Sequence, residues 1–158
     1  MIEFRPAPLD APVSLDLIEA VQQEYVVRYG SRDVSQLSVA EFTPPQGIFV
    51  IGWDADQPVA CGGVRLVTPD VGELKRMYVA PAARRRGIAR AMLANLESQA
   101  RTLGATRLRL ETGLQQPEAL SLYASAGYLE TEPFGPYAGA RLARHFARSL
   151  VDADAARS

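Results

Sequence analysis

Three consecutive arginines, Arg84, Arg85 and Arg86, and then Gly87 separate an apolar segment from the start of a helical pattern. Backbone N–H groups at the start of a helix have no partner within the helix, and the helix dipole adds a partial positive charge there. The three guanidinium groups would strengthen that field, and the glycine would let the backbone come close to an anion. The pattern is typical of a phosphate-binding turn, and the alternative is a solvated basic loop before a helix.

The elements that would hold this turn follow from the periodicity of the chain. Glu73 to Val79 is expected to be a strand, and Ile88 to Leu103, which carries apolar residues at helical spacing, a helix. Further strands are expected over residues 2–5, 47–53, 59–67 and 106–112, and helices over residues 14–29 and 117–126. This order predicts one domain of the α/β or α+β class with a mixed sheet.

Three details of this assignment rest on few residues. Ser14 is expected to cap the first helix, and Ser38 with Glu41 spells a capping box for a short second one. Apolar residues over 143–151 favour a helix at the end of the domain. The domain is expected to span residues 1–150, and residues 151–158 to form a flexible tail.

Composition narrows the possible partners. The 158 residues suit one domain, and a net charge of −1 argues against a general nucleic-acid binder. We expect no membrane partner, because no apolar run approaches the roughly 18 residues of a transmembrane helix. Cys61 is the only cysteine and Met1 to Arg5 does not resemble a signal peptide, so a cytoplasmic location is expected. Cys61 itself lies in an apolar context and is expected to be a small core residue.

The residues around the basic turn resemble a known family. Arg84 to Ala89 matches the pattern Gln/Arg-x-x-Gly-x-Gly/Ala of the GCN5-related N-acetyltransferases (GNAT), and the segment before it resembles that family's fourth strand. Glu111 to Gly113, followed by Tyr123 and by residues 126–128, resembles the fifth strand and its helix. Together the motifs cover Glu73 to Tyr128.

The resemblance implies a fold and a donor. The fold would be a central mixed, mostly antiparallel sheet flanked by helices, with the fourth and fifth strands splayed apart. Acetyl-coenzyme A would lie in that gap and pass its acetyl group to an amine by direct attack, without a metal. The residues implied in binding it are Met77, Tyr78, Val79, Arg84, Arg85, Arg86, Gly87, Ile88, Ala89 and Gln116. At Gln116 the family often has asparagine.

The resemblance also implies two catalytic residues. Tyr123 matches the usual general acid, which would protonate the departing thiolate; from periodicity alone it could be a core tyrosine. Glu73 matches the place of a general base in several members; it could also simply pair with Lys75 or Arg76. Glu111 and Glu41 are weaker candidates for the base.

The acceptor is not specified by the motifs. The resemblance places the acceptor pocket beside Tyr25 and beside a turn carrying Phe134 and Tyr137, although both aromatics could equally pack inward. We expect a small-molecule amine; the alternatives are a protein or peptide N-terminus, or a non-catalytic coenzyme A sensor. A homodimer is possible.

Two further expectations concern the last strand and the only histidine. The resemblance implies a strand over residues 142–148, against the helical periodicity, and we follow the resemblance. His145 is expected at the surface or at a sheet edge. It has no neighbouring cluster of ligands, so we expect no metal site.

Overall fold

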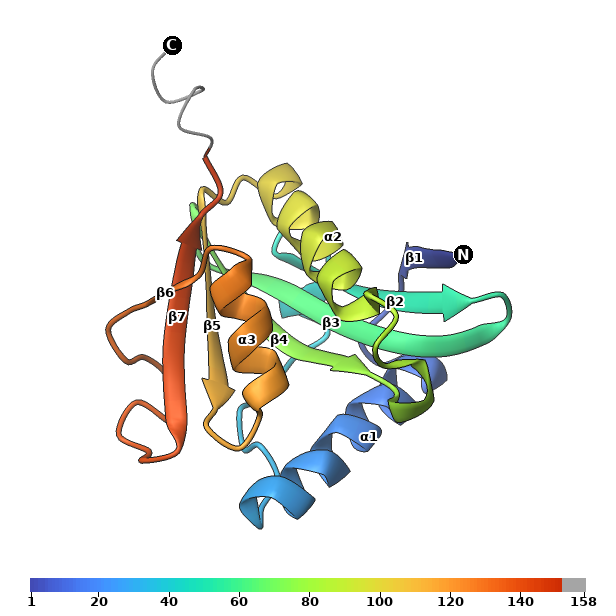
Figure 1. Cartoon of the computed structure of the whole chain (residues 1–158). Coiled ribbons are helices and arrows are strands. Elements are labelled where there is room, and N and C mark those ends of the chain that lie inside the picture. Colours follow the sequence, from blue (N-terminus) through green and yellow to red (C-terminus); the bar gives the residue numbers. More distant parts are fainter. Residues whose placement is uncertain (152–158) are drawn as a thin grey trace.

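The chain forms one seven-stranded sheet flanked by helices in a computed structural model that describes residues 1–151 (Figure 1). The strands lie in the order β1-β2-β3-β4-β5-β7-β6. Their bounds are β1 (Ile2–Pro6), β2 (Gly47–Asp54), β3 (Gln57–Thr68), β4 (Val71–Val79), β5 (Arg107–Gly113), β6 (Leu129–Glu130) and β7 (Ala143–Ser149). The helices are α1 (Pro12–Tyr29), α2 (Ile88–Thr102) and α3 (Pro117–Ser125), with short 3-10 turns η1 (Ala40–Phe42) and η2 (Pro81–Ala83).

The sheet opens between β4 and β5. Every neighbouring pair of strands is antiparallel except this one, which is parallel. β4 pairs with β5 only from Val71 to Glu73, opposite Arg107 to Arg109. Beyond that point the two strands separate, as Figure 1 shows. The mixed, mostly antiparallel sheet with splayed fourth and fifth strands is therefore confirmed.

A bulge interrupts β4 where it leaves β5. Cys61 of β3 pairs with Tyr78, whereas Gly63 pairs with Lys75, so β4 carries one extra residue between the two pairs. Arg76 lies in this bulge with φ 57°. The thiol of Cys61 donates to the Arg76 carbonyl at 3.3 Å, and burial raises the pKa of Cys61 to about 12. The expectation that Cys61 is a small core residue is therefore confirmed.

Alternation along β2 divides the core between the two faces of the sheet. Val50 packs in the cluster formed with α2 and α3, whereas Phe49 and Ile51 pack in the cluster under α1. The apolar stripe of α2 contributes Met92 and Leu96, both fully buried, to the first cluster. The two helical layers thus cover the sheet from both sides, and the gap between β4 and β5 lies within the sheet, between its fourth and fifth strands.

Some local expectations need correction. α1 begins at Pro12, and Ser14 does not cap it, because its buried hydroxyl donates to the Pro8 carbonyl at 2.6 Å. The helix favoured by periodicity at the end of the domain is wrong: residues 143–149 form β7 and pair with β5 over its whole length. The strand implied by the resemblance is confirmed there. His145 is not at the surface but only 4% exposed, inside β7.

Other expectations hold in detail. The capping box exists, because Ser38 Oγ accepts from the Glu41 amide at 3.3 Å and the Glu41 carboxylate accepts from the Ser38 amide at 3.2 Å. It precedes a 3-10 turn of three residues, η1. Of the expected tail, only Val151 is described, and residues 152–158 lie outside the described residues.

Candidate functional site

Two adjoining hollows open where β4 and β5 part. The first, called the long groove here, has a volume of about 610 Å³ and runs between β4, the turn before α2, and α3. The second, called the side hollow, has a volume of about 400 Å³ and lies between the end of α1, β4, β5 and residues 137–143. Seven residues line both of them: Tyr25, Leu74, Lys75, Arg76, Glu111, Thr112 and Gln116.

The turn at Gly87 forms one end of the long groove. Gly87 has φ 76° and Arg85 has φ 65°, so the backbone is left-handed at both positions. A Cβ built on Gly87 would have no atom within 4 Å, which leaves open space in front of the turn. The first backbone bond of α2 runs from the Ala91 amide to the Gly87 carbonyl. The amides before it, including those of Ile88 and Ala89, therefore have no partner within the helix.

The three arginines of the turn have different surroundings. Arg84 donates to the Val79 carbonyl at 2.9 Å and to Glu24 at 2.6 Å, and so links the turn to the end of β4 and to α1. Arg86 does not line the groove and pairs with Asp54 at 3.0 Å. Arg85 lines the groove and has no ion-pair partner within residues 1–151. Only one of the three guanidinium groups is thus free to meet an anion in the groove.

One wall of the long groove is an unpaired edge of β4. Met77, Tyr78 and Val79 all line the groove, and β5 does not pair with any of them. An extended ligand could therefore add to this edge in the manner of a strand.

Tyr123 of α3 lies in the opposite wall. Its side chain lines the long groove, and the residue is only 6% exposed. Its ring packs edge-on against Tyr128 with centroids 5.7 Å apart. In the described part of the chain its hydroxyl has no hydrogen-bond partner, and burial raises its pKa. The phenol therefore stays protonated and has a donor to offer to a ligand.

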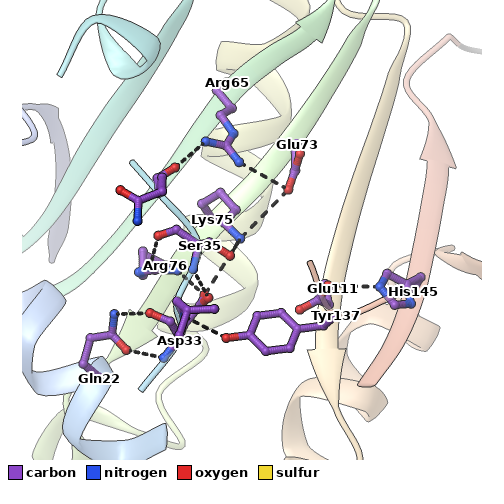
Figure 2. A network of polar contacts seen from close by, with 12 residues as sticks. Gln22, Asp33, Ser35, Arg65, Glu73, Lys75, Arg76, Glu111, Tyr137 and His145 are labelled. Carbon is purple, nitrogen blue, oxygen red and sulfur yellow. Dashed lines mark hydrogen bonds and ion pairs between the residues drawn. The ribbon is translucent and has the colours of Figure 1, made fainter. Parts of the chain in front are cut away.

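Glu73 lies in a network of ion pairs (Figure 2) and lines neither hollow. Its carboxylate is 3.1 Å from Arg109, 3.8 Å from Arg65 and 3.9 Å from Lys75. Of the two cations named in the structural alternative, Lys75 is a partner at 3.9 Å, whereas Arg76 pairs with Asp33 instead. These contacts do not place Glu73 beside a substrate.

Glu111 lies where the two hollows meet. Its carboxylate is 3.0 Å from Nε2 of His145, its direct partner across β5 and β7 (Figure 2). Burial raises the pKa of Glu111, although the bond to His145 opposes the shift. Sequence reasoning did not pair these two residues. If residues 142–148 are aligned as a strand antiparallel to β5, the register of the two strands sets Glu111 opposite His145.

The side hollow is walled by the loop after α1. Gln22 accepts from the Asp33 amide at 2.7 Å and donates to the Asp33 carbonyl at 3.1 Å. The Asp33 carboxylate forms an ion pair with Arg76 of the β4 bulge. Tyr137 lines the hollow from the other side, and its hydroxyl accepts from the Val34 amide at 2.7 Å (Figure 2).

Of the other residues implied in substrate or donor binding, some line the hollows and one does not. Tyr25 and Gln116 line both hollows, and the Gln116 side chain accepts from the Tyr29 hydroxyl at 3.0 Å. Phe134 lines neither hollow. Its ring lies under the Arg109 guanidinium at 3.9 Å and against His145 with centroids 4.8 Å apart. It matches the inward-packed alternative.

Comparison with known proteins identifies this arrangement. The model of the acetyltransferase (GNAT) family matches residues 15–128, which is more than half of the chain. The chain belongs to the GNAT family. Members of this family are acetyl-CoA-dependent acyltransferases, so the chain is an N-acetyltransferase enzyme by family, as the motifs implied.

Individual relatives agree with the GNAT assignment. An IAA acetyltransferase of Azospirillum brasilense is 34% identical over 134 residues, which cover 84% of this chain and 87% of the relative. A solved structure from Klebsiella pneumoniae, proposed to be an acyl-CoA N-acyltransferase, has a TM-score of 0.80 and 30% identity and covers 96% of this chain and 99% of that one.

A GNAT acetyltransferase of Elizabethkingia anophelis, solved with acetyl-CoA bound, shares the fold with a TM-score of 0.70 at 15% identity, covering 94% and 97% of the two chains. Over residues 1–151, no helix is long and apolar enough to span a membrane. The same residues contain no group of three or more His, Cys, Asp or Glu side chains that could hold a metal ion.

Proposed function

We propose that this chain acetylates a primary amine of a small molecule, with acetyl-CoA in the long groove and the amine in the side hollow. The observation that carries the proposal is the shared lining of the two hollows at the gap between β4 and β5. Two substrates that enter from different sides would meet there, and direct transfer requires that meeting.

The long groove fits the chemistry of the donor. Its pyrophosphate would lie on the free amides after Gly87, where a left-handed backbone and open space leave room for it. Arg85 would add one charged partner. The pantetheine arm would extend along the edge of β4 at Met77 to Val79, and Gln116 would contact it from the start of α3.

Tyr123 acts as the general acid in the proposed reaction. The amine nitrogen attacks the thioester carbonyl carbon and forms the carbon–nitrogen bond, and the carbon–sulfur bond breaks. The Tyr123 hydroxyl gives its proton to the departing thiolate and regains one from the nitrogen, which must lose a proton as the amide forms. The raised pKa of this phenol opposes complete proton transfer. A hydrogen bond to the sulfur that strengthens as charge develops would still stabilise the transition state.

Glu111 is the carboxylate that we propose as general base. A cationic amine must lose a proton before it attacks, and Glu111 lines both hollows, whereas Glu73 lines neither. Burial raises the pKa of Glu111 and so makes it a better proton acceptor near neutral pH than an exposed carboxylate. His145 would act as a positioning residue by holding this carboxylate at 3.0 Å.

The test of this function is coenzyme A release in the presence of a panel of amines, followed with a thiol reagent, with the acetylated product confirmed by mass spectrometry. We expect release to require an amine and to match the amount of product. Binding of acetyl-CoA without turnover on any amine or peptide would favour the sensor alternative. Turnover on peptides alone would favour a protein or peptide acceptor.

A further inference from the structure

The side hollow carries more positive than negative side chains. Four cations line it, Arg32, Lys75, Arg76 and Arg141, against two carboxylates, Asp33 and Glu111. A ligand in this hollow would therefore meet a positive potential. An acceptor that offered only a cationic amine would not be favoured by such a lining.

Two of the four cations are already neutralised. Arg76 forms its ion pair with Asp33 in the wall of the hollow, and its side chain is 3% exposed. Arg32 forms two hydrogen bonds of 2.8 Å with the carboxylate of Glu19 on α1. The charges of these two arginines are therefore directed at groups of the protein.

The other two cations have capacity to spare. Lys75 donates to the Ser35 hydroxyl at 3.2 Å, whereas its two nearest carboxylates, those of Asp33 and Glu73, are both 3.9 Å away. An ammonium group has three donors, and only one is used at hydrogen-bond distance. Arg141 is exposed and forms no ion pair within residues 1–151.

The carboxylates cannot balance this surplus. Burial alone would raise the pKa of Asp33, but Arg76 and Lys75 hold that pKa below its ordinary value, so the carboxylate is ionised and committed to them. The Glu111 carboxylate is held by His145. Lys75, whose nearest carboxylate oxygens are 3.9 Å away, and Arg141, which forms no ion pair within residues 1–151, therefore keep donors for a ligand.

The size of the hollow is restricted by a hydrogen bond between its walls. The Tyr137 hydroxyl accepts from the Val34 amide at 2.7 Å and so joins the loop before β7 to the loop after α1. Figure 2 shows the Tyr137 ring between the Asp33 loop and the Glu111–His145 pair. With about 400 Å³ behind this link, the space suits a compact molecule better than an extended peptide.

We propose that the acceptor is a small amino acid, whose amine reaches Glu111 while its carboxylate is held by Arg141 and Lys75. Guanidinium and ammonium groups together are suited to a carboxylate, because the first binds it in a fork and the second as a point charge. This inference rests on the proposed function, because it assigns the acceptor to the side hollow.

The experiment compares acceptors that differ only at the carboxylate. Each amino acid in a panel is assayed beside its carboxamide and beside the corresponding amine without the carboxyl carbon, with acetyl-CoA saturating. We expect kcat/KM to be at least tenfold higher for the amino acid. The carboxamides have less basic amines and would be favoured if the carboxylate played no part, so the comparison is biased against the proposal.

Arg141→Gln provides the matched variant. It should remove most of that preference by raising KM for the amino acid, with a much smaller effect on kcat/KM for the carboxamide. Arg107→Gln is the control, because Arg107 is exposed on β5, donates to Thr131 and lines neither hollow. It should keep the full preference.

The outcomes separate this inference from the proposed function. Equal or faster turnover of the carboxamides, or an unchanged preference in Arg141→Gln, would overturn the inference and leave amine acetylation standing. No turnover of any small amine would instead overturn the proposed function. Turnover of amino acids only when they begin a peptide would overturn the restriction to small acceptors.

Discussion

At the residue scale, the proposed reaction depends on two groups with opposite tasks. Tyr123 must keep a proton until the thiolate leaves, and Glu111 must take one from the amine. Desolvation raises the pKa of both groups, which keeps the phenol protonated until the thiolate forms and makes the carboxylate a better proton acceptor. The long groove brings the two residues to the same gap in the sheet.

Glu111→Gln should lower kcat about 10²–10⁴-fold, the usual contribution of a general base. In the wild type only the carboxylate form is active, so kcat/KM should fall as the pH drops through the raised pKa of Glu111. This fall is the acid limb of the pH–rate profile. The variant should lose the acid limb and keep the pH dependence that comes from deprotonation of the amine. The measurement is a pH–rate profile of both proteins.

Two further variants, His145→Asn and Glu73→Gln, make the Glu111 test specific. If Nε2–H of His145 donates to Glu111 and so lowers its pKa, His145→Asn should move the acid limb to higher pH. Glu73→Gln should disturb stability through its three cations and keep the limb. An acid limb that disappears in Glu73→Gln and persists in Glu111→Gln would assign the base to Glu73.

Tyr123→Phe should lower kcat about 10²-fold or more with little change in KM, because the lost hydrogen bond forms only as the thiolate develops. Tyr128→Phe is the control, since it removes a neighbouring phenol that donates to Glu97 and lines neither hollow. It should lower the melting temperature and keep kcat. Steady-state kinetics on both variants gives kcat and KM. A wild-type kcat in Tyr123→Phe would exclude Tyr123 as the general acid.

At the element scale the site depends on two interruptions of regular structure. The bulge in β4 brings the consecutive side chains of Lys75 and Arg76 to the same carboxylate, Asp33, although neighbours on a regular strand face opposite sides. The left-handed turn before α2 exposes the free amides of that helix to the long groove. The bulge follows the point where β4 leaves β5, and the turn lies beyond the end of β4.

Gly87→Val should weaken acetyl-CoA binding at least about tenfold, because a β-branched residue disfavours the left-handed backbone by about 1–2 kcal/mol and would intrude into the open space before the amides. Calorimetric titration gives the dissociation constant. Gly135→Val is the matched control: Gly135 also has a positive φ, 73°, with no atom within 4 Å of a built Cβ, and lies outside both linings. Equal affinities for all three proteins would contradict this role of the turn.

Some of these elements could be predicted from local sequence signals, and others could not. The turn at Gly87 and α2 were predictable, because a glycine, arginines and a helical apolar stripe are local signals. β7 was not predictable from periodicity. Its residues pair with β5 and β6, and Arg148 pairs with Glu97 of α2, so polar and apolar residues do not alternate regularly along the strand. The bulge at Arg76 and the link from Tyr137 to Val34 depend on distant partners and leave no local pattern.

At the scale of the whole molecule, the proposed arrangement keeps the two substrates apart until they meet at the gap between β4 and β5. The helices cover the two faces of the sheet, and the only parallel pair of strands in the described chain parts to make the gap. The long groove opens beside α2 and α3, and the side hollow beside α1 and the loop before β7. The central claim is therefore that donor and acceptor enter by different openings and react between Glu111 and Tyr123.

The decisive measurement is a crystal structure with coenzyme A and an amine that the enzyme acetylates. We expect the pyrophosphate on the amides after Gly87, the thiol near Tyr123, and the amine nitrogen in the side hollow within reach of Glu111. An amine bound outside the side hollow, or a coenzyme A chain that occupies it, would rule out this arrangement of donor and acceptor.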